Sequence, residues 1–188
     1  MPILQCKLKR SWSVVNIRST VNIRLLIKLA FFFSIVLIAD ILTKYLTQYY
    51  ISADPYYHFG YPYGGVPIFE NWMGIEFSIV HATNRGMAWG LLSSMPHLLL
   101  MARIVLIIGM IVYLCKAKLA FKMQLPLVII IAGALGNVVD AAFYGHVIDM
   151  FKFVFWGYHF PVFNFADSAI FCGVSFLFIQ SFFERNHE

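Results

Sequence analysis

The chain places four aspartates and one lysine in or beside segments that are otherwise apolar. They are Asp40, Lys44, Asp140, Asp149 and Asp167. An ionisable side chain inside a membrane costs several kcal/mol even by the lowest estimates, so each of these residues is a candidate for a functional role. Carboxyl groups in such positions favour chemistry in which protons are given and taken.

Asp149 lies in the stretch GHVIDM and Asp167 in FNFADSAI, and each stretch borders an apolar segment. Two carboxylates about 4 Å apart repel by about 4 kcal/mol at an effective dielectric near ~20, which corresponds to about three pK units. One of the two therefore keeps a proton near neutral pH. An ionised acid beside a protonated one can activate water while its partner donates to a carbonyl, as in aspartic peptidases. Such a pair titrates as a unit, so the sequence does not assign the shared proton.

Each aspartate also has a simpler interpretation. Pro161 marks the start of a helical segment for which Asn164 is a candidate N-cap, so Asp167 would be an acid that favours the helix dipole. Gly145 can end the preceding helix in the left-handed conformation, and Asp149 after it would be a solvated loop acid. Taken singly, these roles suffice. The location of both acids at one boundary favours the pair.

Two further polar groups are expected near the pair. The stretch AGALGNVVDAAFYG puts Gly133, Gly136, Asn137 and Asp140 on one face of a helix. The glycines let a neighbouring helix approach closely. Asn137 and Asp140 then either bond across this helix contact or contact a substrate, and both roles stay open.

Asp40 and Lys44 are one helical turn apart with the acid first, a spacing that favours an ion pair. The pair is either a local structural salt bridge or part of a site. The alternative function is a small proton-linked membrane transporter that uses the intramembrane carboxylates as a relay. It has less support, because a relay should reach the inner side, and the inner halves of the apolar segments hold almost no polar side chains.

Composition indicates the elements that must hold these groups. Apolar residues make up 61% of the chain and charged residues 12%, about half the charged share of a soluble domain. Four segments are long enough to cross a hydrocarbon core as helices, namely 25–46, 96–115, 125–143 and 163–183. The predicted fold class is a membrane all-α domain. Basic residues cluster before the first segment and between the second and third, so both termini are expected to be cytoplasmic.

Residues 1–24 are expected to form a basic N-terminal cytoplasmic extension, and 25–185 a four-helix domain that includes an extracytoplasmic loop over 47–95. In that loop Ile75, Phe77 and Ile79 recur at the period of a half-buried strand, which should stop at Asn84, Arg85 and Gly86. A loop of this length is more than a simple connection. It predicts a small β-sheet on the outer membrane surface.

These motifs together resemble one known family, lipoprotein signal peptidase, also called signal peptidase II. The matching blocks are NRGMAWG (84–90), GALGNVVD (133–140), GHVIDM (145–150) and FNFADSAI (163–170). ADILTKYL (39–46) is similar to the first-helix motif of that family. The resemblance extends over about residues 25–183.

The resemblance implies an aspartic endopeptidase of the bacterial inner membrane that removes signal peptides from diacylglyceryl-modified prolipoproteins. Asp149 and Asp167 are the implied catalytic pair. The residues implied to bind substrate or to support the site are Asn84, Asn137, Asp140, Asn164, Asp40 and Lys44. Membrane lipids and cyclic peptide inhibitors of the globomycin type are implied partners. No nucleic acid, metal or other cofactor is implied.

One position departs from the family pattern. The family usually has arginine directly after the aspartate of its G-N-x-x-D block, where this chain has Ala141. That arginine is associated with holding the substrate backbone. Arg85 or Arg103 is the hypothesised source of the missing positive charge.

Overall fold

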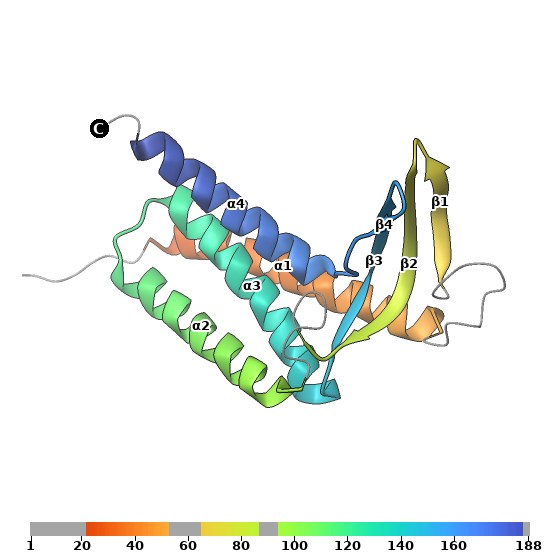
Figure 1. The fold of residues 1–188 in the computed structure, drawn as a ribbon. Coiled ribbons are helices and arrows are strands. Elements are labelled where there is room, and N and C mark those ends of the chain that lie inside the picture. Colours follow the sequence, from red (N-terminus) through yellow and green to blue (C-terminus); the bar gives the residue numbers. More distant parts are fainter. Residues whose placement is uncertain (1–21, 53–64, 87–93, 186–188) are drawn as a thin grey trace, which may run out of the picture.

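The computed structural model describes residues 22–52, 65–86 and 94–185. Within these ranges four helices form a bundle (Figure 1): α1 (Ile23–Tyr50), α2 (Pro96–Lys116), α3 (Phe121–Tyr144) and α4 (Phe165–Arg185). Each helix is long and apolar enough to cross a membrane, so the four predicted spans are confirmed. Their ends differ from the predicted ends by a few residues, because hydropathy marks the apolar stretch rather than the last hydrogen-bonded turn.

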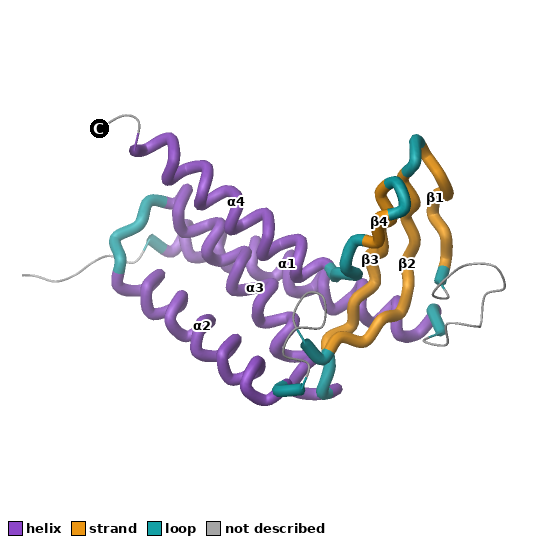
Figure 2. The backbone as a smooth tube through the Cα atoms, viewed as in Figure 1, coloured by secondary structure: helices purple, strands orange, loops and turns teal. Residues whose placement is uncertain are grey.

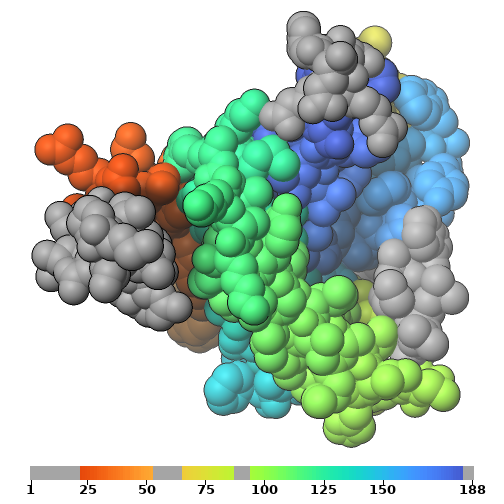
Figure 3. Space-filling model, turned by 90° about the vertical axis from the view of Figure 1, so that its left-hand side faces the viewer, coloured from red at the N-terminus to blue at the C-terminus, as the bar shows by residue number. Residues whose placement is uncertain are grey.

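Helix α3 is the centre of the bundle. In its most apolar stretch 56% of the residues are buried, against 11–17% in the other three helices. Figure 3 shows α3 between α1 and α4, with α2 beside α3. The other three helices expose many large apolar side chains, as expected of helices that face lipid.

Close packing of α3 depends on the two glycines predicted to allow it. A Cβ atom at Gly133 would lie 2.6 Å from the carbonyl oxygen of Ala166 on α4, and one at Gly136 would overlap the carboxylate of Asp40 on α1. Only a residue without a side chain permits these two contacts. The packing role of this face is therefore confirmed, and it puts the neighbouring polar residues of α3 between α1 and α4.

The predicted sheet is present and is larger than expected. Four antiparallel strands are ordered β1 (Val66–Trp72), β2 (Ile75–Asn84), β3 (Val147–Phe155) and β4 (Tyr158–His159). The tube in Figure 2 shows them as one layer beside the ends of the helices. Strands β1 and β2 come from the loop between α1 and α2, and β2 ends at Asn84, within the predicted stop at 84–86. Strands β3 and β4 come from the loop between α3 and α4, for which no strand was predicted.

The pairing of β2 with β3 brings two sequence motifs together. Ala82 pairs with Asp149 and Asn84 with Val147, beyond an irregularity that follows Ile79. Neighbouring strands lie about 4.8 Å apart. The side chain of Asn84 is therefore within reach of the strand that contains Asp149.

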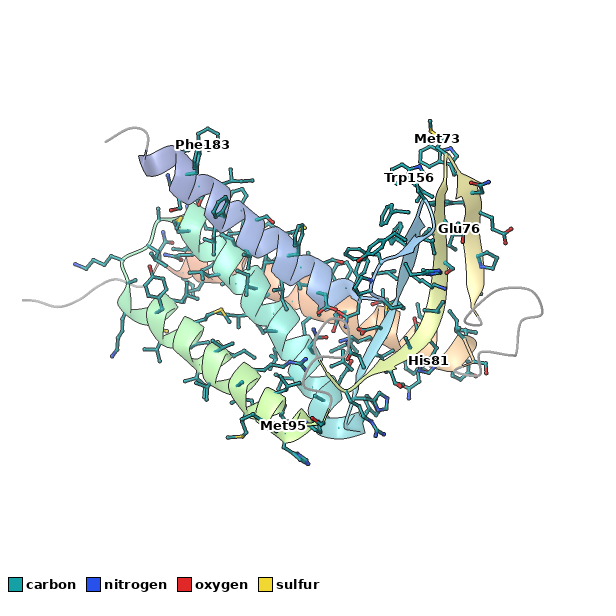
Figure 4. The ribbon with its side chains drawn as sticks, viewed as in Figure 1. Met73, Glu76, His81, Met95, Trp156 and Phe183 are labelled. Carbon is teal, nitrogen blue, oxygen red and sulfur yellow. The ribbon has the colours of Figure 1, made fainter. Side chains whose placement is uncertain are left out.

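Aromatic side chains of the sheet stack on one another. Phe77 of β2 stacks on Phe153 of β3 with ring centroids 4.4 Å apart, and Phe163, just before α4, stacks on Phe153 at 6.0 Å. Met73 and Trp156 are exposed at the far tip of the sheet (Figure 4). Such side chains suit the headgroup layer. That the sheet rests on the outer membrane surface remains a prediction.

Some predictions concern residues outside the described ranges. They are the N-terminal extension up to residue 21, the part of the first outer loop over 53–64, and residues 87–90 of the NRGMAWG block. The boundary expected after residue 24 falls in the first turn of α1. The division into extension and domain stays a prediction.

Candidate active site

Asp149 lies within strand β3 and is only 2% exposed. The interpretation of this residue as a solvated loop acid is wrong, because β3 pairs with β2 and carries the carboxylate into the interior. Two side-chain amides donate to it. Asn84 Nδ2 lies 3.0 Å from one carboxylate oxygen, and Asn164 Nδ2 lies 2.8 Å from the other.

Asp167 lies in the first turn of α4, where it takes part in a capping box. The Asp167 amide donates to Asn164 Oδ1 at 2.9 Å, and the Asn164 amide donates back to Asp167 Oδ2 at 3.3 Å. The predicted capping roles of both residues are confirmed. The second carboxylate oxygen of Asp167 accepts from Asn137 Nδ2 at 2.8 Å. Capping therefore fixes the orientation of this carboxylate without removing it from the site.

Both carboxylates line one cavity of about 530 Å³. Its polar wall includes Asn84, Asn137 and Arg103, and its apolar wall comes mainly from the segment before α4 and from the first turns of α4. That wall includes Phe160, Val162, Phe163 and Phe171. An apolar cavity with a few convergent polar groups is the usual form of a ligand site.

The pKa of Asp149 differs from that of an ordinary surface acid. Its pKa is raised to about 7, first by burial and second by the negative charge of Asp167. The amide donors Asn84 and Asn164 and the Lys44 ammonium lower it by less. A carboxyl group with this pKa exchanges its proton near neutral pH, as general acid–base catalysis requires.

Behind the cavity lies a closed ion cluster of Asp40, Lys44 and Asp140. Lys44 Nζ lies 2.8 Å from Asp40 Oδ2, 2.9 Å from Asp140 Oδ2 and 3.0 Å from Asn137 Oδ1. An ammonium group has three hydrogens, so these contacts saturate it. The predicted pair of Asp40 and Lys44 is confirmed, and a second acid, Asp140, joins it.

The two acids of this cluster also hold backbone groups. Asp40 Oδ1 accepts from the Ala166 amide at the start of α4, at 2.9 Å. Asp140 Oδ2 accepts from the Ile148 amide in β3, at 3.2 Å. The cluster on α1 and α3 thus fixes the elements that carry Asp167 and Asp149. Of the two roles left open for Asp140, the bond across an element contact is the one observed.

Asn137 connects the ion cluster to the carboxylate pair. Its Oδ1 accepts from Lys44 and, at 3.0 Å, from Asn164 Nδ2. Its amide nitrogen is therefore left to donate to Asp167. Because an ammonium can face only the oxygen of an amide, Lys44 sets the orientation of Asn137.

All eight predicted site residues converge at one end of the bundle. Three amides, those of Asn84, Asn137 and Asn164, contact the carboxylate pair directly. The ion cluster is connected to the pair through Asn137. Of the two arginines, Arg103 lines the cavity and Arg85 does not. Ser168 and Phe171 of the cavity wall were not predicted, although Phe171 follows Asp167 by four residues and so lies on the same helical face. In the described part of the chain, no three His, Cys, Asp or Glu residues are grouped to hold a metal ion.

Comparisons with known proteins agree on one family. Residues 32–183 match the family described as signal peptidase (SPase) II. The lipoprotein signal peptidase of Staphylococcus haemolyticus is 33% identical over 153 residues, which cover 81% of this chain and 91% of the relative. That of Anoxybacillus flavithermus is 31% identical over 152 residues, covering 80% and 83%.

Two solved structures described as bacterial membrane enzymes have a similar fold. One superposes with a TM-score of 0.71 at 27% identity and covers 86% of this chain and 91% of its own. The other has a TM-score of 0.66 at 28% identity and covers 81% and 91%. The helical bundle and its sheet are thus shared with a membrane enzyme.

Proposed function

The chain belongs to the signal peptidase II family, and we propose that it removes signal peptides from diacylglyceryl-modified prolipoproteins as an aspartic endopeptidase. Membership of the family makes it a multi-pass membrane peptidase. The aspartic mechanism, the residues that perform it and the lipid-modified substrate belong to the proposal.

The observation that supports the mechanism most directly is the shared cavity of Asp149 and Asp167. The two carboxylates arrive from different elements, β3 and α4, and no cation pairs directly with either among the described residues. Their negative charge is compensated only in part, by hydrogen bonds from amide N–H groups. Such a pair can hold one proton and exchange it, which a fully paired carboxylate cannot do.

In the proposed reaction, protonated Asp149 donates its proton to the scissile carbonyl oxygen while ionised Asp167 takes a proton from the attacking water. The water oxygen forms the new bond to the carbonyl carbon, which becomes tetrahedral. Collapse breaks the carbon–nitrogen bond: Asp167 gives its proton to the leaving amine, while Asp149, now ionised, takes a proton back from a hydroxyl of the intermediate as the carbonyl reforms. The raised pKa of Asp149 supports its role as the acid, because it still holds a proton near neutral pH.

The apolar wall of the cavity supports a substrate that stays in the membrane. Phe160, Val162 and Phe171 line it, and Phe171 lies on the exposed face of α4. A diacylglyceryl group would lose about 0.8 kcal/mol for each methylene moved from lipid into water. An enzyme whose site opens between apolar side chains avoids that loss.

The position of the site also bears on how the chain is oriented in the membrane. The carboxylates lie at the end of the bundle where α1 and α3 end and α4 begins. If both termini are cytoplasmic, this is the outer boundary of the inner membrane. There the signal peptide of an exported precursor leaves the bilayer.

The test uses the purified full chain in detergent with a diacylglyceryl-modified precursor. The parent should cleave it, and Asp149→Asn and Asp167→Asn should not. Glu70→Gln, an acid-to-amide change on exposed strand β1, is the matched control and should cleave like the parent. Cleavage that persists in either aspartate variant would refute the aspartic mechanism. Proton flux in vesicles without any cleavage would favour a transporter instead.

The substrate and inhibitor parts of the proposal are tested separately. The same precursor without its diacylglyceryl group should be a much poorer substrate. A cyclic peptide of the globomycin type should block cleavage by the parent. Equal cleavage of both precursors would refute the lipid requirement while leaving the mechanism intact.

A further inference from the structure

A second pocket, of about 240 Å³, lies beside the cavity and shares Asn84 and Arg103 with it. It is formed where the end of β2, the start of α2 and the end of α3 meet. Its wall is completed by Arg85, Pro96, His97, Leu99, Leu100, Ala141, Gly145 and His146. None of the residues that form this pocket belongs to the carboxylate pair.

The charge of this pocket is one-sided. Two arginines and two histidines line it, and no carboxylate does. Neither Arg85 nor Arg103 has an ion-pair partner among the described residues. Arg103 donates to the carbonyl oxygen of Gly86 at 3.2 Å, a neutral partner that leaves its charge uncompensated. Uncompensated arginine is unexpected at the end of the bundle that the positive-inside rule puts outside.

The start of α2 adds partial positive charge to the same pocket. The helix begins at Pro96 after Met95, with no side-chain cap and no acid in its first turn. The first amides of a helix therefore lack a side-chain acceptor here, and their aligned dipoles favour an anion. Helix start, two arginines and two histidines together form an anion site rather than an isolated helix end.

The apolar part of the wall indicates which anion. Leu99 and Leu100 of α2 and Ala141 of α3 line the same pocket. A free phosphate would gain nothing from these side chains, whereas the glycerol and upper acyl carbons of a lipid would pack on them. A zwitterionic head group would bring its ammonium to a pocket without a carboxylate. The chemistry therefore favours a net-negative glycerophospholipid.

We propose that this pocket binds the phosphate of an anionic phospholipid of the outer leaflet, with Arg85 and Arg103 holding the phosphate oxygens. Arginine suits the role because its planar fork donates to phosphate through two parallel bonds. Basic pockets between transmembrane helices are known binding sites for anionic head groups. The ligand differs from a peptide substrate, although Asn84 and Arg103 line both pockets. Only the placement of the lipid in the outer leaflet rests on the proposed function, through its orientation.

The test measures lipid retention by the delipidated full chain in a neutral detergent, using native mass spectrometry with phosphatidylglycerol and phosphatidylcholine. The parent should retain phosphatidylglycerol at least about tenfold more strongly, the equivalent of about 1.4 kcal/mol. Arg85→Gln combined with His97→Gln should lose that preference. Lys116→Gln combined with Lys118→Gln, at the opposite end of α2, is the control and should keep it.

A preference for phosphatidylglycerol that survives in Arg85→Gln/His97→Gln would overturn the proposal. Loss of the preference in the Lys116/Lys118 control as well would also overturn it, because overall charge would then explain the binding. Inorganic phosphate is added in a third arm. Displacement of the lipid by millimolar phosphate would refute a lipid site, while retention in the presence of phosphate would support it.

Discussion

Two groups of carboxylates lie at the same end of this bundle, and their surroundings differ. Asp40 and Asp140 are paired with Lys44, and the cluster faces the interior between α1 and α3. Asp149 and Asp167 receive only amide hydrogens and line a cavity of about 530 Å³. The residue type is the same in both groups, so surroundings rather than identity separate the two roles.

The difference concerns how each charge is compensated. The charge of a buried carboxylate beside an ammonium is compensated by a direct ion pair. A buried carboxylate beside another carboxylate is destabilised when both are ionised. The ion cluster is therefore suited to holding elements in place, and the carboxylate pair to proton transfer. Each prediction below tests the role of either the ion cluster or the carboxylate pair.

The largest effect is expected at the carboxylate pair. Asp149→Asn or Asp167→Asn should lower the cleavage rate at least about 10⁴-fold, about 5.5 kcal/mol of activation free energy. The thermal unfolding midpoint should not fall, because an amide can keep part of the same hydrogen bonds and has no charge to bury. Cleavage of the modified precursor and unfolding in detergent are measured on the same preparations. A variant that loses activity only because it unfolds would break the division.

The next largest effect is expected in the ion cluster and should appear in stability. Lys44→Met leaves Asp40 and Asp140 buried without a cation, which costs about 3–5 kcal/mol in comparable buried pairs. Unfolding by denaturant in detergent measures this loss. Lys116→Met, which removes an exposed lysine at the other end of the bundle, is the control. Unchanged stability in Lys44→Met would show that the cluster does not hold the fold.

The helices were predictable from sequence because each signal is local. Hydropathy alone located the four spans, and Gly145 does end α3 in the left-handed conformation, with φ 72°. Asn164 was identifiable as an N-cap for a similar reason, since the capping residue and the first turn are adjacent in the chain. Signals of this kind need no knowledge of what lies elsewhere in the fold.

Strand β3 was not predictable in the same way. Its residues VIDMFKFVF do not alternate cleanly between apolar and polar, and the strand forms because β2 lies beside it. The burial of Asp149 depends on this pairing, and so does its contact with Asn84. The third contact of Lys44, with Asn137, likewise joins residues 93 positions apart. Such facts depend on packing between distant segments, which no local pattern encodes.

A smaller effect is expected in the pH dependence of stability. The pKa of Asp149 is raised from 3.8 to about 7, so between these values the folded state binds more protons than the unfolded state. Stability from this group is complete below about pH 4 and is lost as the pH rises through about 7, by at most about 4 kcal/mol. In Asp149→Asn this loss should be absent.

The measurement compares unfolding of the parent and Asp149→Asn from pH 4 to pH 8 in the same detergent. The difference between the two curves isolates the one group, and Glu70→Gln shows how much any single exposed acid contributes. Parallel curves for the parent and Asp149→Asn would mean that this carboxyl is ionised in the fold throughout the range.

The smallest effect is expected at Arg103, a cation that lines the same cavity as the carboxylate pair. Its guanidinium lines the cavity and donates to the Gly86 carbonyl, while the Gly86 amide donates to Asn84 Oδ1 at 2.9 Å. Asn84 in turn donates to Asp149. Arg103 thus positions a donor to the pair, and in the proposed function its charge faces the peptide. It is the better candidate for the charge missing at Ala141.

Arg103→Gln should lower kcat/KM about tenfold, or about 1.4 kcal/mol, with most of the change in KM if the charge holds the peptide backbone. A shift of the pH–rate profile would instead indicate that Arg103 acts through Asn84 on Asp149. Arg103→Lys should restore the charge but not the fork of two donors, so its rescue should be partial. Cleavage kinetics in neutral detergent exclude any contribution from anionic lipid. An Arg103→Gln enzyme with unchanged kinetics would show that the pair works without a neighbouring cation, which would sharpen its contrast with the lysine-bound cluster.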